Sequence, residues 1–355
     1  MRLFGAFFAI GLASSLHAQA AESKTADQVY KNILELKGTP ADQLLPAMQF
    51  ISSSLGVDCA FCHVQGKPEA DDKGPKKTAR NMMAMTTRIN KASFGGRQQI
   101  TCYSCHRGSA RPVNTPPVQE SDAPARTMAP AAPPAGTAPT VDQIVDKYVA
   151  ALGGADAIRK VTSRAMKGAI LVGGNQTPID LFTKAPNKRI SISHMPSGNS
   201  ITAFDGAVGW LGATGRPARE MSAAEAAAAG LDAEFYFALR LKELFPQLRR
   251  ARPEEIGVVE CEVLNAAGPG RPAVRLYFDR QSGLLLRIVR YADTPVGRNP
   301  TQIDYADYRE ADGVKIPFRW TLARPNGRFT IQLAEVKSNV EVDDAMFAKP
   351  AGEVK

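Results

Sequence analysis

The chain has 355 residues, of which 44% are hydrophobic and 22% are charged, and its formal net charge is +9. This apolar content excludes a disordered chain, and the length exceeds what one small domain needs, so two domains are expected. The positive charge is spread along the chain and no nucleic-acid-binding motif is present, which argues against a nucleic-acid partner.

The first twenty residues have the pattern of an export signal. Arg2 precedes an apolar run from Leu3 to Leu16, and Ala18-Gln19-Ala20 has the small-x-small form of a signal-peptidase site. A retained membrane anchor is the alternative, but the run is short for a membrane span. We therefore expect residues 1–20 to be a signal peptide cleaved near Ala20, and the mature protein to be periplasmic.

Residues 21–111 are expected to form an all-α domain. Apolar residues at helical spacing predict three helices, over residues 25–38, 39–56 and 75–90. The first has a capping-box pattern at Thr25 and Gln28, and the second should end at Gly56. Pro46 should kink the second helix or restart it.

The second and third predicted helices are each followed by Cys-x-x-Cys-His. A c-type haem is attached through two thiols added to its vinyl groups; the two-residue gap brings both sulfurs to one edge of the ring, and the adjacent histidine reaches the iron. A four-cysteine zinc site or two disulfides are alternatives, but neither explains why histidine follows both motifs. Two covalently attached haems are predicted, with Cys59, Cys62, Cys102 and Cys105 as thioether residues and His63 and His106 as proximal iron ligands.

Histidines are too few to ligate both irons on both sides. Of the four in the chain, His17 leaves with the signal and His194 alone lies outside the motifs. Methionine thioethers are the usual alternative as the second axial ligand. Two filled axial positions leave no place for a substrate at the iron, so electron transfer is expected rather than catalysis.

Methionines on the two preceding helices are the distal-ligand candidates. Met48 precedes the first motif, and Met82 is preferred for the second. Met85 is the alternative to Met82 because it shares the i,i+3 face, whereas Met83 points elsewhere. The competing explanation is that these side chains only fill the core.

A proline-rich segment follows the two motifs. Between Pro112 and Pro139, 8 of the chain's 25 prolines fall within 28 residues, which predicts a stiff Pro/Ala-rich linker over 112–139. Residues 140–355 then begin with one helix and continue with strand-like segments, including hairpins around Arg280–Gly283 and Asp312-Gly313. With a further helix capped by Ser222, the expected rear domain is α+β, with a curved antiparallel sheet and covering helices.

Three stretches of the front domain carry a family likeness: LPAMQFISSSLGVDCAFCHV, KKTARNMMAMTTRIN and ITCYSCHRG. Over about residues 27–111 they resemble the cytochrome c subunit of photosynthetic reaction centres. In that family each haem is held by a helix, a turn and Cys-x-x-Cys-His, with methionine as sixth ligand for most haems. The resemblance implies one site from Met48, Cys59, Cys62 and His63, and another from Met82, Cys102, Cys105 and His106. The family usually has four haems, whereas this chain has one pair of motifs.

The rear domain carries a weaker likeness in YVAALGGADAIRKV, FDGAVGWLG, YFDRQSGLLLR and YREADGVKIPFRW. These stretches are similar to periplasmic carriers of outer-membrane lipoproteins, which wrap an incomplete antiparallel barrel around helices. The resemblance implies a concave apolar face that could take acyl chains or an apolar segment of another protein. A self-filled domain that docks the cytochrome to a partner is the alternative. Cys261 is expected to be a buried free thiol, with a disulfide-linked dimer as the alternative.

The sequence therefore predicts an exported di-haem c-type cytochrome that transfers single electrons and is not an enzyme. Its partners would be a redox donor and acceptor, with a peripheral place on a membrane electron-transfer complex. A lipid- or lipoprotein-binding protein whose haems sense redox state or act as a tether is the second hypothesis. A haem peroxidase is the third, and it would require a five-coordinate iron.

Overall fold

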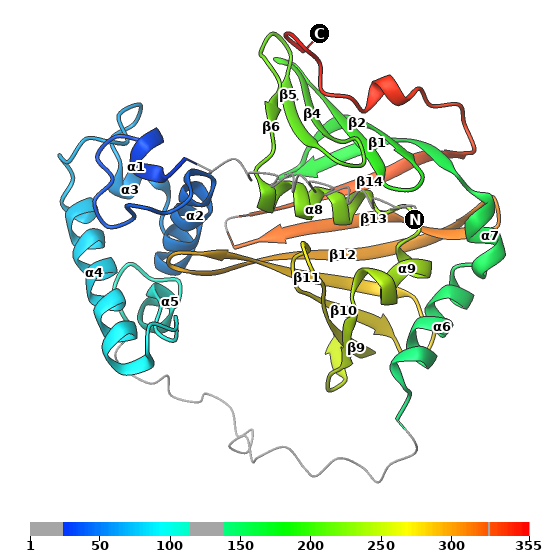
Figure 1. Ribbon diagram of the computed structural model, residues 1–355, viewed down its shortest axis with the longest axis horizontal. Coiled ribbons are helices and arrows are strands. Elements are labelled where there is room, and N and C mark those ends of the chain that lie inside the picture. The colour runs from blue at the N-terminus through cyan, green and yellow to red at the C-terminus, as the bar shows by residue number, and fades with distance from the viewer. Residues whose placement is uncertain (1–23, 114–137, 326, 355) are drawn as a thin grey trace, which may run out of the picture.

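The computed structural model describes residues 24–113, 138–325 and 327–354. The expected signal peptide and most of the expected linker lie outside the described residues. Figure 1 shows two parts, a group of helices from the front of the chain and a large curved sheet from the rear. No helix within the described ranges is long and apolar enough to cross a membrane.

The front part consists of short helices and turns around one long helix. α2 ends at Gly56 in the left-handed conformation (φ 66°), and α4 ends in the same way at Gly95 (φ 60°). Gly56 is the predicted terminator, and α4 is longer than the predicted third helix. The elements are α1 (Ala26–Val29), η1 (Ala41–Gln43), α2 (Leu44–Leu55), α3 (Cys59–Cys62), α4 (Gly74–Phe94) and α5 (Cys102–His106).

The first predicted helix is wrong beyond its first turn. The capping box forms, but Tyr30 has extended dihedral angles and Asn32 has a φ of +59°. The Asp27 carboxylate accepts a hydrogen bond from the Gly38 N–H at 2.8 Å, which closes the segment into a loop. The apolar residues of this segment line a cavity instead of covering a helix face.

The second predicted helix is split. Pro40 precedes a 3₁₀ turn, η1, and α2 starts only at Leu44 instead of near residue 39 as expected. Pro46 lies in the first turn of α2, where its missing N–H costs no intrahelical hydrogen bond. Of the two outcomes expected at Pro46, a kink or a restart, the structure has the restart: η1 ends and α2 begins just before this proline.

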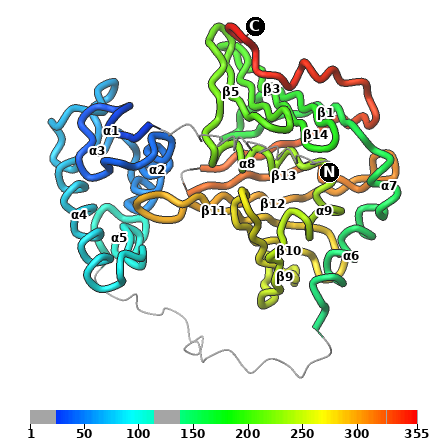
Figure 2. The backbone as a smooth tube through the Cα atoms, in the orientation of Figure 1, coloured from blue at the N-terminus to red at the C-terminus, as the bar shows by residue number. Residues whose placement is uncertain are grey.

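The rear part contains a 14-stranded antiparallel sheet among the described residues. Its order is β6-β5-β4-β3-β2-β1-β14-β13-β12-β11-β10-β9-β7, with β8 paired to β9, so the first and last strands do not meet and the sheet stays open. The tube in Figure 2 shows how the sheet curves. The strands are β1 (Ser163–Val172), β2 (Asn175–Lys184), β3 (Lys188–Met195), β4 (Gly198–Phe204), β5 (Gly209–Ala213), β6 (Arg219–Glu220), β7 (Gln247–Arg250), β8 (Glu254–Ile256), β9 (Val259–Ala267), β10 (Val274–Asp279), β11 (Leu285–Thr294), β12 (Gly297–Ala311), β13 (Val314–Arg324) and β14 (Gly327–Ser338).

Helices cover parts of this sheet. Tyr148 of α6 and Leu241 of α9 are buried in the largest apolar cluster together with strand residues such as Leu276 and Leu333. The α+β architecture with a curved, unclosed antiparallel sheet is confirmed for the rear domain, and both predicted hairpin turns join neighbouring strands. Cys261 on β9 is buried and free. The helical elements are α6 (Val141–Ala151), α7 (Ala155–Lys160), α8 (Ala223–Ala233), α9 (Phe237–Leu244) and η2 (Asp344–Met346).

One rear-domain hairpin reaches the front part. In Figure 1 the tip between β11 and β12 lies beside α2. The side-chain amide of Gln98 donates to the carbonyl oxygens of Thr294 (3.1 Å) and Pro295 (2.6 Å). Val296 at the same tip packs against an apolar cluster that includes Met48. The two parts are therefore in direct contact through this hairpin tip.

Candidate functional site

The first Cys-x-x-Cys-His motif forms a single helical turn, α3. The Asp58 carboxylate caps it by accepting from the Phe61 N–H at 2.9 Å, which places Cys59 and Cys62 on one turn. His63 follows directly, and its Nδ1 lies 2.8 Å from the carbonyl oxygen of Pro68. With Nδ1 donating to this carbonyl, the lone pair of Nε2 is left for a metal.

A cavity of about 1190 Å³ opens beside this motif. Cys59, Cys62 and His63 line it together with Met48 from α2. The loop that replaces the first predicted helix supplies apolar walls, including Leu34, which is 49% exposed. A thiol pair, an imidazole and a thioether around one apolar cavity form the donor set that a c-type haem needs.

A second methionine also faces this cavity. Met83 of α4 lines it and packs with Met48 against the buried side chains of Leu36 and Leu44. The sequence pattern excluded Met83 from the second haem, and the structure places it in the wall of the first cavity. That placement follows from its position on α4, on the same face as Lys76 and Arg80, which line the cavity as well.

Lys76 is a site residue that the sequence analysis missed. Its side chain is buried, and its ammonium group donates at 2.9 Å to the carbonyl oxygens of Pro68, Glu69 and Ala70. The Pro68 oxygen is the one that His63 contacts. Lys76 therefore holds the loop that orients the expected proximal ligand. In the sequence, only a lysine in the first turn of a helix, after a polar loop, hinted at this role.

Arg80 is already paired within the protein. Its guanidinium contacts the Asp71 carboxylate at 2.9 Å and donates to the Asn32 carbonyl oxygen at 3.1 Å. The pKa of the Asp71 carboxyl lies far below its usual range, and the hydrogen bond from Arg80 is the largest cause. The hydrogen bond to Asn32 ties α4 to the loop that forms the cavity wall, and the ion pair ties α4 to the segment that precedes it.

The second motif is built in a similar way on α5. The capping box of Thr101 and Ser104 starts the helix, and His106 Nδ1 lies 2.9 Å from the Ser109 carbonyl oxygen. The buried side chain of Asn90 fixes the approach to this helix, because its oxygen accepts from two backbone N–H groups and its nitrogen donates to Ile100. Each motif histidine thus has Nδ1 on a backbone carbonyl, leaving Nε2 as the metal-facing nitrogen.

Met82 and Met85 lie on α4 away from the first cavity, and neither lines it. At about 100° per residue, Met85 is about 200° around the helix from Met83. Both are partly buried. The structure therefore keeps Met82 and Met85 as candidates for the second motif without separating them.

The two motifs meet at the end of α2. The Gly108 N–H, just after the second motif, donates to the Ser54 carbonyl oxygen at 2.9 Å. A Cβ on Gly56 would lie only 2.1 Å from the Gly108 carbonyl oxygen, so this close approach needs glycine. The helix that carries Met48 therefore touches the segments of both motifs.

The alternative assignments for the cysteines lack support. All five are free, so no disulfide links the motif thiols in the described chain. Over the same residues no three Cys, His, Asp or Glu side chains converge as a metal site would require. Burial raises the pKa of the Cys62 and Cys102 thiols, which keeps both groups protonated.

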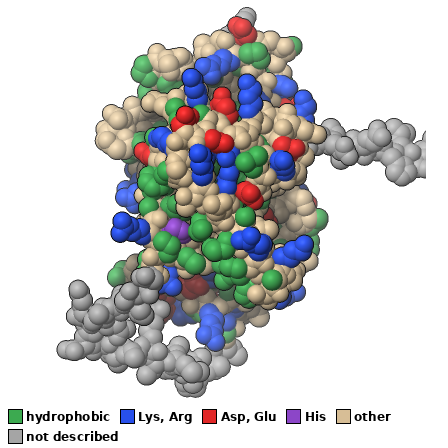
Figure 3. Space-filling model, turned by 90° about the vertical axis from the view of Figure 1, so that its left-hand side faces the viewer, with side chains coloured by type: hydrophobic (Ala, Val, Ile, Leu, Met, Phe, Trp, Pro, Cys, Tyr) green, Lys and Arg blue, Asp and Glu red, His purple; other side chains and the backbone are tan. Residues whose placement is uncertain are grey.

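The outer surface of the front domain combines apolar and basic side chains. Figure 3 shows this face, where hydrophobic side chains lie among Lys and Arg side chains and also among Asp and Glu side chains. Phe61 and Tyr103, each within a motif, are 41% and 56% exposed. Residues 21–111 carry 13 Lys/Arg and 8 Asp/Glu. The excess of basic over acidic residues in this domain is suited to an acidic protein partner.

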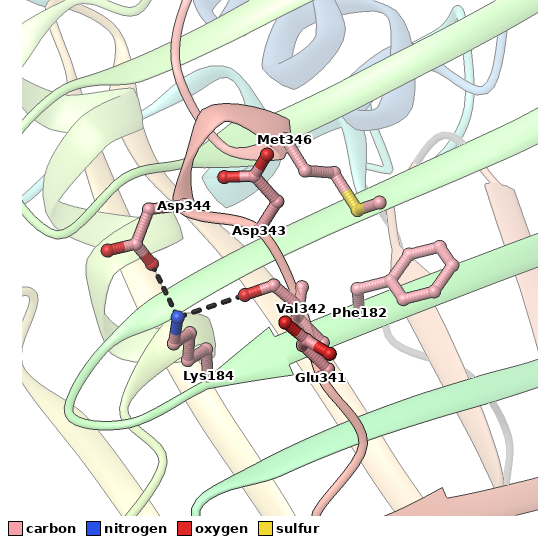
Figure 4. A pocket seen from close by; sticks show the side chains of 7 residues that line it. All are labelled: Phe182, Lys184, Glu341, Val342, Asp343, Asp344 and Met346. Atoms are coloured by element: carbon pink, nitrogen blue, oxygen red, sulfur yellow. Dashed lines mark hydrogen bonds and ion pairs between the residues drawn. The ribbon is translucent and has the colours of Figure 1, made fainter.

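A smaller cavity, of about 710 Å³, lies in the rear domain between β2 and the C-terminal segment (Figure 4). Its lysine, Lys184, already contacts Asp344 and the Val342 carbonyl oxygen, both at 2.9 Å. The remaining polar side chains lining it are carboxylates, so this cavity offers neither a thiol nor an imidazole to a haem. The ring nitrogens of His194 are also occupied. They contact Asp180 and Asn199, both at 2.9 Å, so neither nitrogen is left to bind a haem iron.

Comparison with known proteins supports the likeness of the front domain. Residues 10–144 match the family model described as the photosynthetic reaction centre cytochrome C subunit. The front part of the chain resembles this subunit. The curated subunit from Thermochromatium tepidum is 29% identical over 102 residues, which are 28% of this chain and 25% of that protein. The subunit from Rubrivivax gelatinosus is 29% identical over 91 residues, 24% of this chain and 25% of that protein. The chain thus spans about a quarter of the length of the curated relatives it matches.

Solved structures similar to this chain match the other, weaker likeness. A LolA superfamily protein from Nitrosomonas europaea has a TM-score of 0.42 at 14% identity, covering 60% of this chain and 99% of that one. A DUF1329 family protein from Desulfovibrio piger has a TM-score of 0.44 at 14% identity, covering 59% and 97%. Both scores lie below 0.5, so the likeness is too loose to assign a ligand or a function to the rear domain.

Proposed function

We propose that this protein is an exported, periplasmic di-haem c-type cytochrome that transfers single electrons. The observation that carries the proposal is the first cavity, where the thiols of Cys59 and Cys62, the imidazole of His63 and the thioether of Met48 meet. The family match over residues 10–144 supports it independently. Neither observation depends on the rear domain.

The chemistry assigned to each residue follows from its contacts. The Cys59 and Cys62 thiols would each add across one vinyl group, forming a C–S bond while the thiol proton goes to the neighbouring carbon, so no redox partner is needed. His63 would donate a hydrogen bond from Nδ1–H to the Pro68 carbonyl oxygen and offer Nε2 to the iron. Met48 would supply the second protein ligand of the iron. Such a haem, once bound, supplies a one-electron Fe(III)/Fe(II) couple.

The second site is proposed by the same logic. Cys102 and Cys105 would attach the second haem, and His106, held by the Ser109 carbonyl oxygen, would be its proximal ligand. We prefer Met82 as the distal ligand and keep Met85 as the alternative. Because α2 touches both motif segments, the two haems would form a short relay within one domain.

The partners proposed are a protein that donates electrons and a protein that accepts them. By analogy with the matched family, one of them would belong to a membrane electron-transfer complex. The basic and apolar outer face of the front domain would dock them. The acyl-chain carrier is the weaker alternative, because side chains of α6 and α9 fill the main apolar cluster of the curved sheet. A peroxidase is disfavoured by the methionine candidates on the helix before each motif, since an open iron position would be required.

The attachment is tested by intact-mass measurement of periplasmically expressed protein. Wild-type protein should carry two haem masses after denaturation. The Cys59→Ala/Cys62→Ala and Cys102→Ala/Cys105→Ala proteins should each carry one, whereas Cys261→Ala should keep both. Full haem loading of either double variant, or an unmodified wild-type mass, would overturn the assignment of the motifs.

A further inference from the structure

A group of arginines converges on one carboxylate beneath α8, in a part of the sheet that the proposed electron transfer does not use. Arg290 of β11 forms a two-pronged ion pair with Asp232 of α8, at 2.7 and 3.1 Å. Arg290 is only 8% exposed. The two parallel hydrogen bonds fix Arg290 relative to Asp232, and the two charges compensate each other.

Two further arginines approach the same carboxylate. Burial lowers the pKa of Arg189 of β3, while the Asp232 carboxylate acts in the opposite direction and Arg290 lowers the pKa further. For Arg324 of β13, burial and then Arg290 lower the pKa, and Asp232 opposes them. No hydrogen bond or ion pair to either guanidinium occurs within the described ranges. Both thus lie near Asp232 without being its direct partners.

The arginines meet because the sheet is curved. β3 and β11 are six positions apart in the strand order, which would separate their residues by roughly 29 Å in a flat sheet. Both strands nonetheless reach the same helix, because Arg290 donates to the Ala228 carbonyl oxygen and to Asp232 of α8. Arg189 also shares its face of the sheet with its cross-strand neighbour Phe204, whose ring lies against Gly230 of α8. The cluster therefore lies below α8, where the part of the sheet that contains β3 faces the part that contains β11.

The charges of this cluster do not balance. Three guanidinium groups face one carboxylate, and the nearby phenol of Tyr305, whose pKa burial raises far above its usual value, stays neutral and can donate a hydrogen bond. Arg290 is buried, Arg189 is partly buried and Arg324 is exposed, and holding positive charges together at such a partly desolvated site is costly unless an anion compensates them. Forked guanidinium groups suit carboxylate and phosphate oxygens in particular.

We propose that this cluster, Arg189, Arg324 and Tyr305 on the frame of Arg290 and Asp232, is a binding site for an oxyanion, a phosphate or a carboxylate group. Arg189 and Arg324 supply the free donors. Phe204, beside Arg189, is buried against Gly230 of α8, and its ring would have to shift to accept an apolar continuation of the ligand. The oxyanion can therefore be free or can be the head group of an amphiphile.

Calorimetric titration of the intact haem-loaded protein tests this site. The probes are inorganic phosphate and, below its micelle-forming concentration, dodecyl phosphate, with dodecanol as the uncharged probe of the same length. Saturable binding with one equivalent per chain is expected for at least one phosphate probe and not for dodecanol. Binding of both phosphates with similar Kd would indicate a free oxyanion, and binding of dodecyl phosphate alone a head group. Absence of saturable binding by both would overturn the proposal.

Substitutions locate the binding. Arg189→Gln and Arg324→Gln should each weaken Kd by tenfold or more, and Arg249→Gln, an exposed arginine on β7 of the same domain, should leave Kd unchanged. Thermal unfolding gives a second readout, because the anion should raise Tm of the wild type but not of Arg189→Gln. If Arg189→Gln fails to fold, the more exposed Arg324→Gln carries the comparison. Equal affinities in wild type and in these variants would place the anion elsewhere and overturn the site.

Discussion

Gly297, at the tip between β11 and β12, lies directly against the aromatic ring of Phe50 on α2. A Cβ at position 297 would lie 2.4 Å from Phe50 Cζ. The neighbouring Val296 packs in the apolar cluster that includes Met48 and Met83. The rear domain therefore forms part of the packing behind the first haem site, which links the two parts of the chain physically.

Gly297→Ala should loosen this contact. The added methyl group must displace the Phe50 ring or the hairpin, and overpacking of this kind costs about 1–3 kcal/mol of unfolding free energy. Denaturant unfolding measures the loss. Phe50→Leu in the same chain should recover part of it, because the smaller side chain leaves room for the methyl group.

Gly327→Ala is the matched control for this substitution. Gly327 has the same φ of 152°, but a Cβ added there would meet no described atom within 4 Å. A loss at Gly327 equal to that at Gly297 would show that the backbone conformation, and not the contact with Phe50, determines the cost.

Met48 should be the distal ligand of the first haem. Met48→Leu should remove about half of the weak far-red band that a methionine-to-ferric-iron bond produces, and lower one of the two reduction potentials, since the thioether favours ferrous iron. Met83→Leu, in the same cavity wall, is the control and should keep the band. Loss of the band in Met83→Leu but not in Met48→Leu would reverse the two roles.

Met82 and Met85 are separated by the same absorption band. Met82→Leu should remove the contribution of the second haem, so that Met48→Leu/Met82→Leu has no far-red band while both haems stay attached. Met85→Leu should leave the band intact. The opposite pattern would assign Met85 as the ligand, and an unchanged band in both variants would remove α4 as its source.

Lys76→Met should destabilise the front domain. The substitution keeps the length of the side chain but removes three charge-assisted hydrogen bonds to the 68–70 loop, for a loss of about 2–4 kcal/mol of unfolding free energy. Lys77→Met, on the exposed side of the same helix turn, should change it by less than about 0.5 kcal/mol. Similar effects of the two substitutions would contradict the role given to Lys76.

His194 should make a small, pH-dependent contribution to rear-domain stability. Hydrogen bonding to Asp180, and then to Asn199, raises the pKa of His194 in the folded protein. Its contribution is therefore complete below the ordinary pKa of about 6.5 and is lost as the pH rises through the raised value.

The difference in unfolding free energy between wild type and His194→Gln should be largest below the ordinary pKa of about 6.5 and should fade as the pH rises through the raised pKa. It should stay under about 1 kcal/mol and shrink in high salt, because the pair is exposed. A difference that grows with pH would contradict this assignment.

Features set by local sequence were predictable. Gly56 ends α2, Ser222 caps α8, and the Asp312-Gly313 turn joins β12 to β13, as expected. The Cys-x-x-Cys-His motifs indicate their cofactor by spacing alone, without knowledge of the fold. Each of these signals depends on residues within a few positions of one another.

Features that depend on distant contacts were not predictable. The segment after α1 has helical periodicity, yet it forms the cavity wall because Asp27 binds Gly38 and Asn32 takes a positive φ. The role of Lys76 arises from a loop that returns to it. The arginine cluster needs β3 and β11 to face each other, and no pattern in either strand reveals that curvature.

The most direct test of the central claim is the absorption spectrum of the periplasmically expressed protein, oxidised and reduced, with pyridine haemochrome quantitation. We predict two covalently bound haems per chain, both low-spin in both oxidation states, with the far-red band present in the ferric protein. A chain without haem would contradict the claim of a cytochrome. Two haems with a five-coordinate iron would contradict the methionine ligands and electron transfer as the function.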